Sequence, residues 1–296
     1  MANNRPDRIC SEGELEPRKL AEIEHSRARR QVLKGYERRL DTHSSEQAAG
    51  SEALVADKQA FEHHGANLKY YSIAVSSDDF QRAWLKQQCT PGVRVLDFAC
   101  GNGENGIYAA SCGGDVTGID ISPEGVENAN SNAAIAGVGS KCRFEVMDGE
   151  SMTFPDDSFD VVVEYGALHH VDLDAAMREL ARVLKPCGKM ICTEALRHNP
   201  LIHWYRKRTP HLRTAWEVEH ILGVEHLATF RRHFEQVDVR FFHLFGLAAV
   251  PFRRTRLFQS LRKLLDAIDR IVLRSQVIGK YGWIMVVTAE RPRKTV

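Results

Sequence analysis

Residues 93–103, which read VRVLDFACGNG, hold the pattern that decides the fold. An apolar strand runs directly into a turn of small residues, and the acidic Asp97 stands at the junction. Glycine in such a turn allows a sharp bend and the close approach of a ligand, because it has no Cβ and tolerates positive φ. A second apolar strand, 115–119, ends on Asp120. The two strands together predict a nucleotide-like ligand at the carboxyl edge of a parallel sheet.

Composition sets limits on the class of protein. The chain has 296 residues, 43% of them hydrophobic, which suits one large α/β domain with extensions. A formal net charge of +1 gives no bulk field that would favour nucleic acid, so no nucleic-acid partner is expected. The seven cysteines are never spaced as Cys-x-x-Cys, and no secretory signal or membrane-length apolar run is recognisable. We therefore expect reduced thiols and a cytoplasmic location.

Strands and helices alternate regularly through the middle of the chain. This alternation predicts right-handed crossovers and a doubly wound α/β fold with a mostly parallel sheet and helices on both faces. Two later strands are expected to close the sheet as an antiparallel pair, which makes seven. The expected strands cover 93–97, 115–120, 142–147, 159–164, 189–194, 237–244 and 283–288, and the expected core helices cover 104–111, 123–136 and 173–184.

Changes in composition divide the chain into four parts. The first is polar and of mixed charge, and reads as a flexible or partner-docked extension. The second reads as two short helices that cap the ligand site, the third as the ligand-binding core, and the fourth as the end of the fold with helical inserts over the substrate. The parts are 1–60, 61–90, 91–195 and 196–296, and the inserts are 196–233 and 246–278.

Acidic residues at the expected strand ends narrow the ligand class. The segment 101–106 matches G-x-G-x-x-G, which alone is weak evidence for a dinucleotide. Asp97 precedes the glycines, where it would repel a pyrophosphate but would suit a ligand with a cationic amino-acid end. Asp120 can accept hydrogen bonds from ribose hydroxyls, and Asp148 can accept one from an exocyclic adenine amine.

Five motifs in order carry a family resemblance. They are DFACGNG at 97–103, VTGIDIS at 116–122, FPDDSFDVV at 154–162, ALHHV at 167–171 and RVLKPCG at 182–188. In this combination the chain resembles the class I S-adenosylmethionine-dependent methyltransferases, most closely the small-molecule subgroup related to ubiquinone/menaquinone-type methyltransferases. The resemblance covers about residues 91–195 and implies a Rossmann-like seven-stranded sheet. Ala99 and Cys187 depart from the pattern, each replacing a usual glycine.

The resemblance implies S-adenosyl-L-methionine as cofactor and assigns residues to its parts. Asp97 with Ala99, Gly101 and Gly103 would form the turn that holds the methionine end. Asp120 would bind the ribose, and Ile121 would pack on adenine. Asp148, flanked by Met147 and Gly149, would meet the adenine amine. Glu164 and Tyr165 would lie beside the sulfonium and face the acceptor.

Candidate catalytic residues follow the fourth strand. Methyl transfer depends mainly on positioning an in-line acceptor, and a base helps when the acceptor is a hydroxyl or an acidic carbon. His169 and His170 are candidate bases, and packing at a loop junction is their alternative role. Glu164 is a third candidate. Residues expected near the acceptor are Tyr70, Tyr71, Glu194, His198 and Tyr205.

The inserts add basic and apolar side chains. No metal site is expected, because the histidines after residue 196 lack ligand spacing. Segment 253–274 reads as a basic amphipathic helix, for which packing on its own domain is the default. A homo-oligomer contact and a peripheral membrane contact are its alternatives.

The leading functional hypothesis is a methyltransferase acting on a medium-sized, partly apolar small molecule such as a natural product or a lipid- or quinone-like acceptor. A methyltransferase of RNA or protein is a second hypothesis. A third hypothesis is a non-catalytic cofactor-binding protein or a dehydrogenase. Binding of S-adenosylmethionine and not of NAD would speak against a dehydrogenase. The identity of the acceptor and of the methylated atom are left open.

Overall fold

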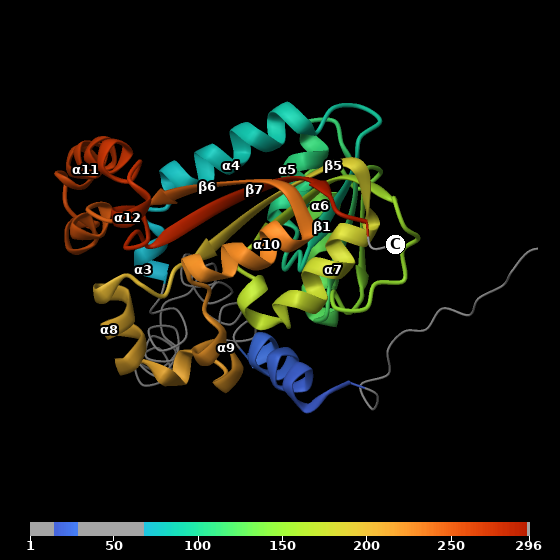
Figure 1. The fold of residues 1–296 in the computed structure, drawn as a ribbon, viewed down its shortest axis with the longest axis horizontal. Helices are drawn as coiled ribbons and strands as arrows, with labels where there is room; N and C mark the ends of the chain where they lie inside the picture. The colour runs from blue at the N-terminus through green and yellow to red at the C-terminus, as the bar shows by residue number, and fades with distance from the viewer. Residues whose placement is uncertain (1–14, 29–67, 295–296) are drawn as a thin grey trace, which may run out of the picture.

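A sheet of seven strands runs through the middle of the molecule (Figure 1). The structure is a computed structural model, and it describes residues 15–28 and 68–294. The strand order is β3-β2-β1-β4-β5-β7-β6. The strands are β1 Arg94–Phe98, β2 Asp115–Asp120, β3 Cys142–Val146, β4 Phe159–Tyr165, β5 Leu184–Ala195, β6 Phe234–Phe242 and β7 Ile284–Pro292.

Strands β1 to β5 pair in parallel, whereas β7 pairs antiparallel with both β5 and β6. This arrangement confirms the predicted doubly wound α/β sheet with an antiparallel final strand. Phe98 pairs with Ile119 and Asp120 pairs with Val146, so the last residues of β1, β2 and β3 meet at one edge. The order changes direction at β1, between β2 and β4, which is where ligands of such sheets bind.

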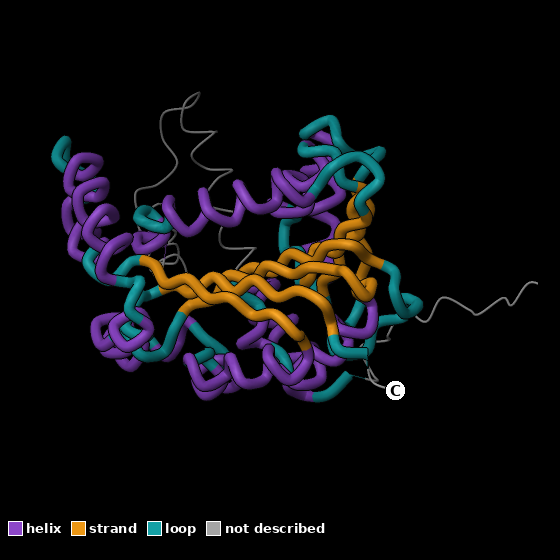
Figure 2. Tube along the Cα trace, turned by 45° about the horizontal axis from the view of Figure 1, so that its top comes forward, coloured by secondary structure: helices purple, strands orange, loops and turns teal. Residues whose placement is uncertain are grey.

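Helices cover both faces of the sheet (Figure 2). One face packs on α4 Val75–Gln88, α5 Glu104–Ser111 and α6 Pro123–Ile135, and the other on α7 Leu173–Val183 and α10 Leu227–His233. Alternate residues of a strand point to opposite faces. Val95 therefore belongs to the apolar cluster of the first face, and its neighbour Leu96 belongs to that of the second.

Capping residues begin two of these helices where the sequence places them. The Ser122 side chain accepts a hydrogen bond from the Gly125 amide at 3.2 Å, and Pro123 occupies the first turn of α6. The Asp172 carboxylate does the same for α7, accepting from the Ala175 amide at 2.9 Å. Both satisfy an amide that the helix leaves unpaired.

The fifth strand differs from its predicted bounds. The sequence predicts a helix over 173–184 and a strand over 189–194, but β5 begins already at Leu184. Phe159 pairs with Leu184, and Val161 pairs with Lys189, so the intervening residues of β5 form an irregularity in the ladder. Helix α7 ends at Val183, shortly before Pro186 and Gly188, and the chain continues through both residues as part of β5.

The remaining described elements lie over the edges of the sheet and at one end of the molecule. They are α3 Leu68–Tyr71, η2 Leu168–His170, α8 Pro200–Arg208, η3 Pro210–Leu212, α9 Ala215–His220, η4 Val224–His226, η5 Gly246–Phe252, α11 Phe258–Val272 and α12 Gln276–Gly279. None of the helices within 15–28 and 68–294 has the length and apolar character needed to cross a membrane.

A helical segment near the N-terminus, residues 17–28, lies beside α9 (Figure 1). The sequence predicts a flexible or partner-docked extension over 1–60. Residues 15–28 instead pack on the chain's own core through ion pairs to residues 124–150. The remainder of that extension, 1–14 and 29–60, lies outside the described residues.

Candidate functional site

A cavity of about 600 Å³ opens at the carboxyl edge of the sheet. Residues at the ends of four strands and residues of nearby helices line it. Within the described part of the chain, it is lined by 98–102 after β1, 119–122 at the end of β2, 147–150 after β3, and Tyr165, Gly166, Ala167, His170 and Val171 after β4. Further lining comes from Arg18, Lys19, Glu22, His25, Ser26, Tyr71, Asp78, Gln81, Arg82, Glu104 and Asn105.

Asp120 is held at the centre of this crevice. Its Oδ2 accepts a hydrogen bond from the Gly101 amide at 2.8 Å, and its Oδ1 accepts one from the Ser122 amide at 2.8 Å. Each carboxylate oxygen can accept a further hydrogen bond. The two amides fix the orientation of the Asp120 carboxylate at the cavity lining, where the ribose assignment places it.

Asp97 lies beneath the turn rather than in the cavity. Its carboxyl is 2% exposed, and its Oδ2 accepts a hydrogen bond from the Gly106 amide of α5 at 2.8 Å. Burial raises the pKa of Asp97 to about 8, against the effect of that hydrogen bond. Gly103, at the start of α5, also lies outside the cavity lining. In this structure the two residues brace the turn from outside the cavity. That they hold the methionine end stays a prediction.

The turn itself uses the left-handed backbone region. The φ angles are 52° at Ala99, 57° at Gly101 and 84° at Gly103. Ala99 therefore adopts a conformation that glycine adopts without strain. In the loop after β3, a Cβ added to Gly149 would lie 2.5 Å from the ring of Phe98, so glycine fits best there. Ala99, Gly101 and Gly149 all line the cavity, together with Ile121 and Met147.

The acids after β3 are paired with the N-terminal helix. Lys19 Nζ lies 2.6 Å from Asp148 Oδ2, and Arg18 Nη1 lies 2.7 Å from Glu150 Oε1. Burial opposes the charge of Glu150, but its hydrogen bonds to Arg18 and Lys19 hold its pKa down at about 2. Asp148 lines the cavity as expected, and the Lys19 ammonium occupies one of its oxygens.

Of the two histidines after β4, His170 lines the cavity and His169 does not. His170 Nδ1 lies 2.9 Å from Glu22 Oε2 of the N-terminal helix. Burial disfavours the imidazolium, but the hydrogen bond and charge of Glu22 outweigh burial and raise the pKa of His170. The Glu22 carboxylate thus favours the imidazolium form of His170 and makes this imidazole a stronger base.

His169 belongs to a buried carboxyl cluster behind the cavity. Its Nδ1 lies 2.7 Å from Glu194 Oε2, and Glu194 Oε1 accepts from the Leu168 amide at 2.6 Å. Burial and the adjacent Glu194 charge raise the pKa of Glu164, whereas His169 overcomes burial and lowers that of Glu194. The cluster therefore favours the neutral form of Glu164 and the charged form of Glu194. Glu164, Glu194 and His169 lie outside the lining, and both glutamates are buried. Their expected place beside the reacting groups stays a prediction.

The expected acceptor residues separate in the structure. Tyr71 lines the cavity. Tyr70 and Tyr205 instead pack against each other, with ring centroids 5.0 Å apart, and neither lines it. His198 is elsewhere, 3.1 Å from Glu225 at the surface. Tyr205 and His198 belong to the insert 196–233 and Tyr70 to the segment 61–90, and no local pattern specifies how these parts are placed on the sheet.

Residues that the sequence did not single out complete the walls. Tyr165 donates a hydrogen bond to Asp78 Oδ1 at 3.1 Å, and Gln81 donates to Asn105 Oδ1 at 2.9 Å. These contacts connect α4 to the strand ends. Strand-end acids can be read from sequence because they follow apolar runs, but Asp78 and Gln81 lie inside a helix without such a marker.

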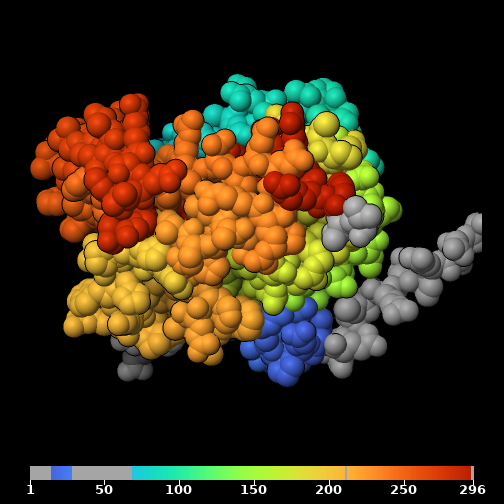
Figure 3. Space-filling model, in the orientation of Figure 1, coloured from blue at the N-terminus to red at the C-terminus, as the bar shows by residue number. Residues whose placement is uncertain are grey.

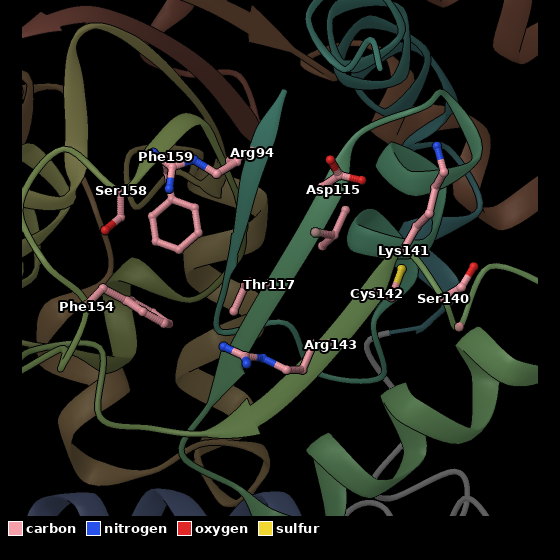
Figure 4. A pocket seen from close by; sticks show the side chains of 12 residues that line it. Arg94, Asp115, Thr117, Ser140, Lys141, Cys142, Arg143, Phe154, Ser158 and Phe159 are labelled. Atoms are coloured by element: carbon pink, nitrogen blue, oxygen red, sulfur yellow. The ribbon is translucent and has the colours of Figure 1, made fainter. Parts of the chain in front are cut away.

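A second depression, of about 640 Å³, lies at the opposite edge of the sheet (Figure 4). It includes the first residues of β1, β2 and β3, among them Arg94, Asp115 and Cys142. Although it is slightly larger, it is not the ligand site that this fold favours, because ligands of parallel sheets bind at the carboxyl ends of the strands.

Comparisons with known proteins agree with this geometry. Residues 96–192 match the family model described as a methyltransferase domain. The sterol 4-C-methyltransferase strm-1 of Caenorhabditis elegans is 27% identical over 203 residues, which are 66% of this chain and 60% of that protein. The 27-O-demethylrifamycin SV methyltransferase of Amycolatopsis mediterranei is 45% identical over 101 residues, 33% of this chain and 37% of that protein. The chain thus spans under two thirds of these relatives.

One solved structure has the same fold at low sequence identity. The geranyl diphosphate C-methyltransferase of Streptomyces coelicolor A3(2) aligns with a TM-score of 0.50 and 16% identity, covering 76% of this chain and 84% of that one. At this identity, the likeness concerns the fold alone.

Proposed function

Because residues 96–192 belong to the class I S-adenosylmethionine-dependent methyltransferases, whose cofactor is S-adenosyl-L-methionine, we propose that the chain methylates a medium-sized, partly apolar small molecule. The observation that carries the proposal is Asp120, oriented by two backbone amides at the floor of a cavity between strand ends. Relatives named for a sterol and for a demethylrifamycin support an acceptor of this kind.

The cavity divides into a cofactor part and an acceptor part. S-Adenosyl-L-methionine supplies a methyl group on a sulfonium that is already activated for displacement. Asp120 would hold the ribose, Asp148 would meet adenine, and Asn105 with the turn at 99–101 would hold the amino-acid end. Tyr71, Tyr165 and His170 are left to position the acceptor. Holding the acceptor in line is the main contribution of the protein.

We propose that His170 rather than His169 takes up the acceptor proton. Glu22 lies 2.9 Å from Nδ1 of His170, and its charge makes the imidazole a stronger base. His169 is already committed to Glu194 behind the cavity wall. Its role would be to fix the loop that carries His170, whose ring centroid is 4.2 Å away.

Cofactor binding provides the first test. S-Adenosyl-L-methionine is expected to bind in titration calorimetry, and NAD is not. Asp120→Ala should weaken binding about 10- to 100-fold, because it removes charge-assisted hydrogen bonds worth about 1.5–3 kcal/mol. Asp115→Ala, at the exposed opposite end of the same strand, is the matched control and should not change affinity. Equal affinity of the two variants would contradict the ribose assignment.

The acceptor class needs a second test. Purified protein with methyl-labelled cofactor should transfer label to organic-soluble acceptors, such as a sterol or a demethylated macrocyclic polyketide. Label found only in protein or RNA would overturn the small-molecule proposal while leaving the cofactor assignment intact. Binding of the cofactor without transfer to any class would favour a non-catalytic binding protein.

A further inference from the structure

Helix α11 is docked with polar residues facing the core. Three of its four buried side chains are charged: Arg262, Asp266 and Asp269, which are 8%, 8% and 4% exposed. Asp269 accepts hydrogen bonds from the Phe245 and Gly246 amides at 2.8 and 3.0 Å, and Arg262 donates to Asp266 at 2.8 Å. These contacts add a polar anchor to the apolar contacts that Phe258, Leu261 and Leu265 make with the core.

The centre of the apolar stripe faces outward. Leu257, Leu264 and Ile271 are 68%, 59% and 70% exposed, and Ile268 is 37% exposed between them. Their spacing of three, four and seven residues places them on one side of the helix. The exposed surface continues onto α12, where Val277 is 74% exposed. An amphipathic helix that served only to close its own core would hide this stripe.

The charges around the stripe have one sign. Within 253–280 the only acidic residues are Asp266 and Asp269, and both are buried. All charged side chains that reach the surface of this segment are therefore cations: Arg253, Arg254, Arg256, Lys263, Arg270, Arg274 and Lys280. This local excess contrasts with a net charge of +1 for the entire chain.

The segment projects at one end of the molecule, where α11 and α12 form a protruding unit (Figures 1 and 3). From the exposed stripe and its cations we propose that residues 253–280 dock on an anionic lipid bilayer. The stripe would enter the interface, and the arginines and lysines would meet acidic headgroups. A second copy of the chain is a poorer occupant, because a two-fold contact would bring the same cations together.

Vesicle co-sedimentation of the full chain tests the proposal. Binding is expected to phosphatidylcholine vesicles that contain phosphatidylserine, and it should weaken as salt rises. Leu264→Glu with Ile271→Glu should abolish it, whereas Ile135→Glu, which alters an 83% exposed apolar residue of α6, should leave it unchanged. Arg270→Gln with Arg274→Gln should weaken binding at least about tenfold.

Three outcomes would overturn the proposal. They are equal binding to vesicles without phosphatidylserine, binding that survives the Leu264→Glu and Ile271→Glu changes, and a wild-type dimer in sedimentation velocity that those changes dissociate. Circular dichroism and cofactor affinity of the same variants show whether they are folded. They also separate this proposal from the methyltransferase proposal, since vesicle binding requires no methyl transfer.

Discussion

At Ala99 the backbone is strained in a way that a single substitution can relieve. Its φ of 52° is left-handed, which costs a residue with a Cβ about 1–2 kcal/mol. Glycine removes that cost, but its greater freedom in the unfolded chain lowers the stability of the folded protein by about 0.4–1 kcal/mol. We expect Ala99→Gly to stabilise the cofactor-free protein by up to about 1 kcal/mol in denaturant unfolding. Ala134→Gly, at an exposed position of α6, should instead destabilise it by about 0.5–1 kcal/mol. Destabilisation by both would show that the turn holds Ala99 without strain.

The sequence predicted the cavity residues at the strand ends better than those on the surrounding helices and loops. Asp120 and Asp148 could be found because each follows an apolar strand, and parallel strands bring their carboxyl ends together. The choice between His169 and His170 could not be made, because which of two adjacent side chains faces a cavity depends on the packing of 168–170. Glu22 lies 148 positions before His170, and no local pattern links such distant partners.

At the scale of elements, helix 17–28 has the geometry of a lid. Arg18, Lys19 and Glu22 line the cavity from one side of the helix. Ile23 is 4% exposed and anchors the helix by an apolar contact. Arg18 also stacks over the Trp216 ring at 4.4 Å and so joins the lid to α9. The helix thus closes the cavity beside Asp148, where adenine is expected.

We expect the double variant Arg18→Ala and Lys19→Ala to release bound S-adenosyl-L-methionine about tenfold faster or more. The change removes partly buried pairs to Asp148 and Glu150, and such pairs are each worth about 1.5–3 kcal/mol. The dissociation rate can be measured by chasing labelled cofactor with unlabelled. Glu24→Ala, on the exposed side of the same helix, is the control. If both variants released cofactor equally slowly, the helix would not act as a lid.

At the scale of the molecule, the sheet could be predicted and the docking of the inserts could not. Alternating apolar strands and capped helices specify a parallel sheet because each connection must cross over in one hand. The amphipathic pattern of 253–274 predicts burial of its apolar face, as in most surface helices. In α11, Phe258, Leu261 and Leu265 do pack against the core, but a buried network of charged groups lies beside them, and Leu264, Ile268 and Ile271 stay exposed. Only the three-dimensional contacts show which part of the apolar face of α11 is buried.

His243 joins that network to the rest of the fold and makes stability depend on pH. It is 1% exposed, with Nε2 3.0 Å from Ser77 of α4 and Nδ1 3.9 Å from Asp266 of α11. Burial, aided by the charge of Arg262, lowers its pKa from 6.5 to about 3. The unfolded chain therefore binds a proton between these values that the folded chain does not, so this contribution to stability is lost as pH falls below 6.5.

One substitution isolates this effect from the many carboxylates that also titrate in acid. At a pH of about 5 the charging of His243 in the unfolded chain should lower wild-type stability by about 2 kcal/mol relative to neutral pH. The His243→Gln variant has no such group to charge. The difference between its free energy of unfolding and that of wild type should therefore shrink by that amount between neutral pH and about pH 5. Denaturant unfolding at both values measures it, with His203→Gln, an exposed histidine, as the control. A deficit that stays constant with pH would mean that His243 is charged in the folded protein, and that the core opens there to solvent.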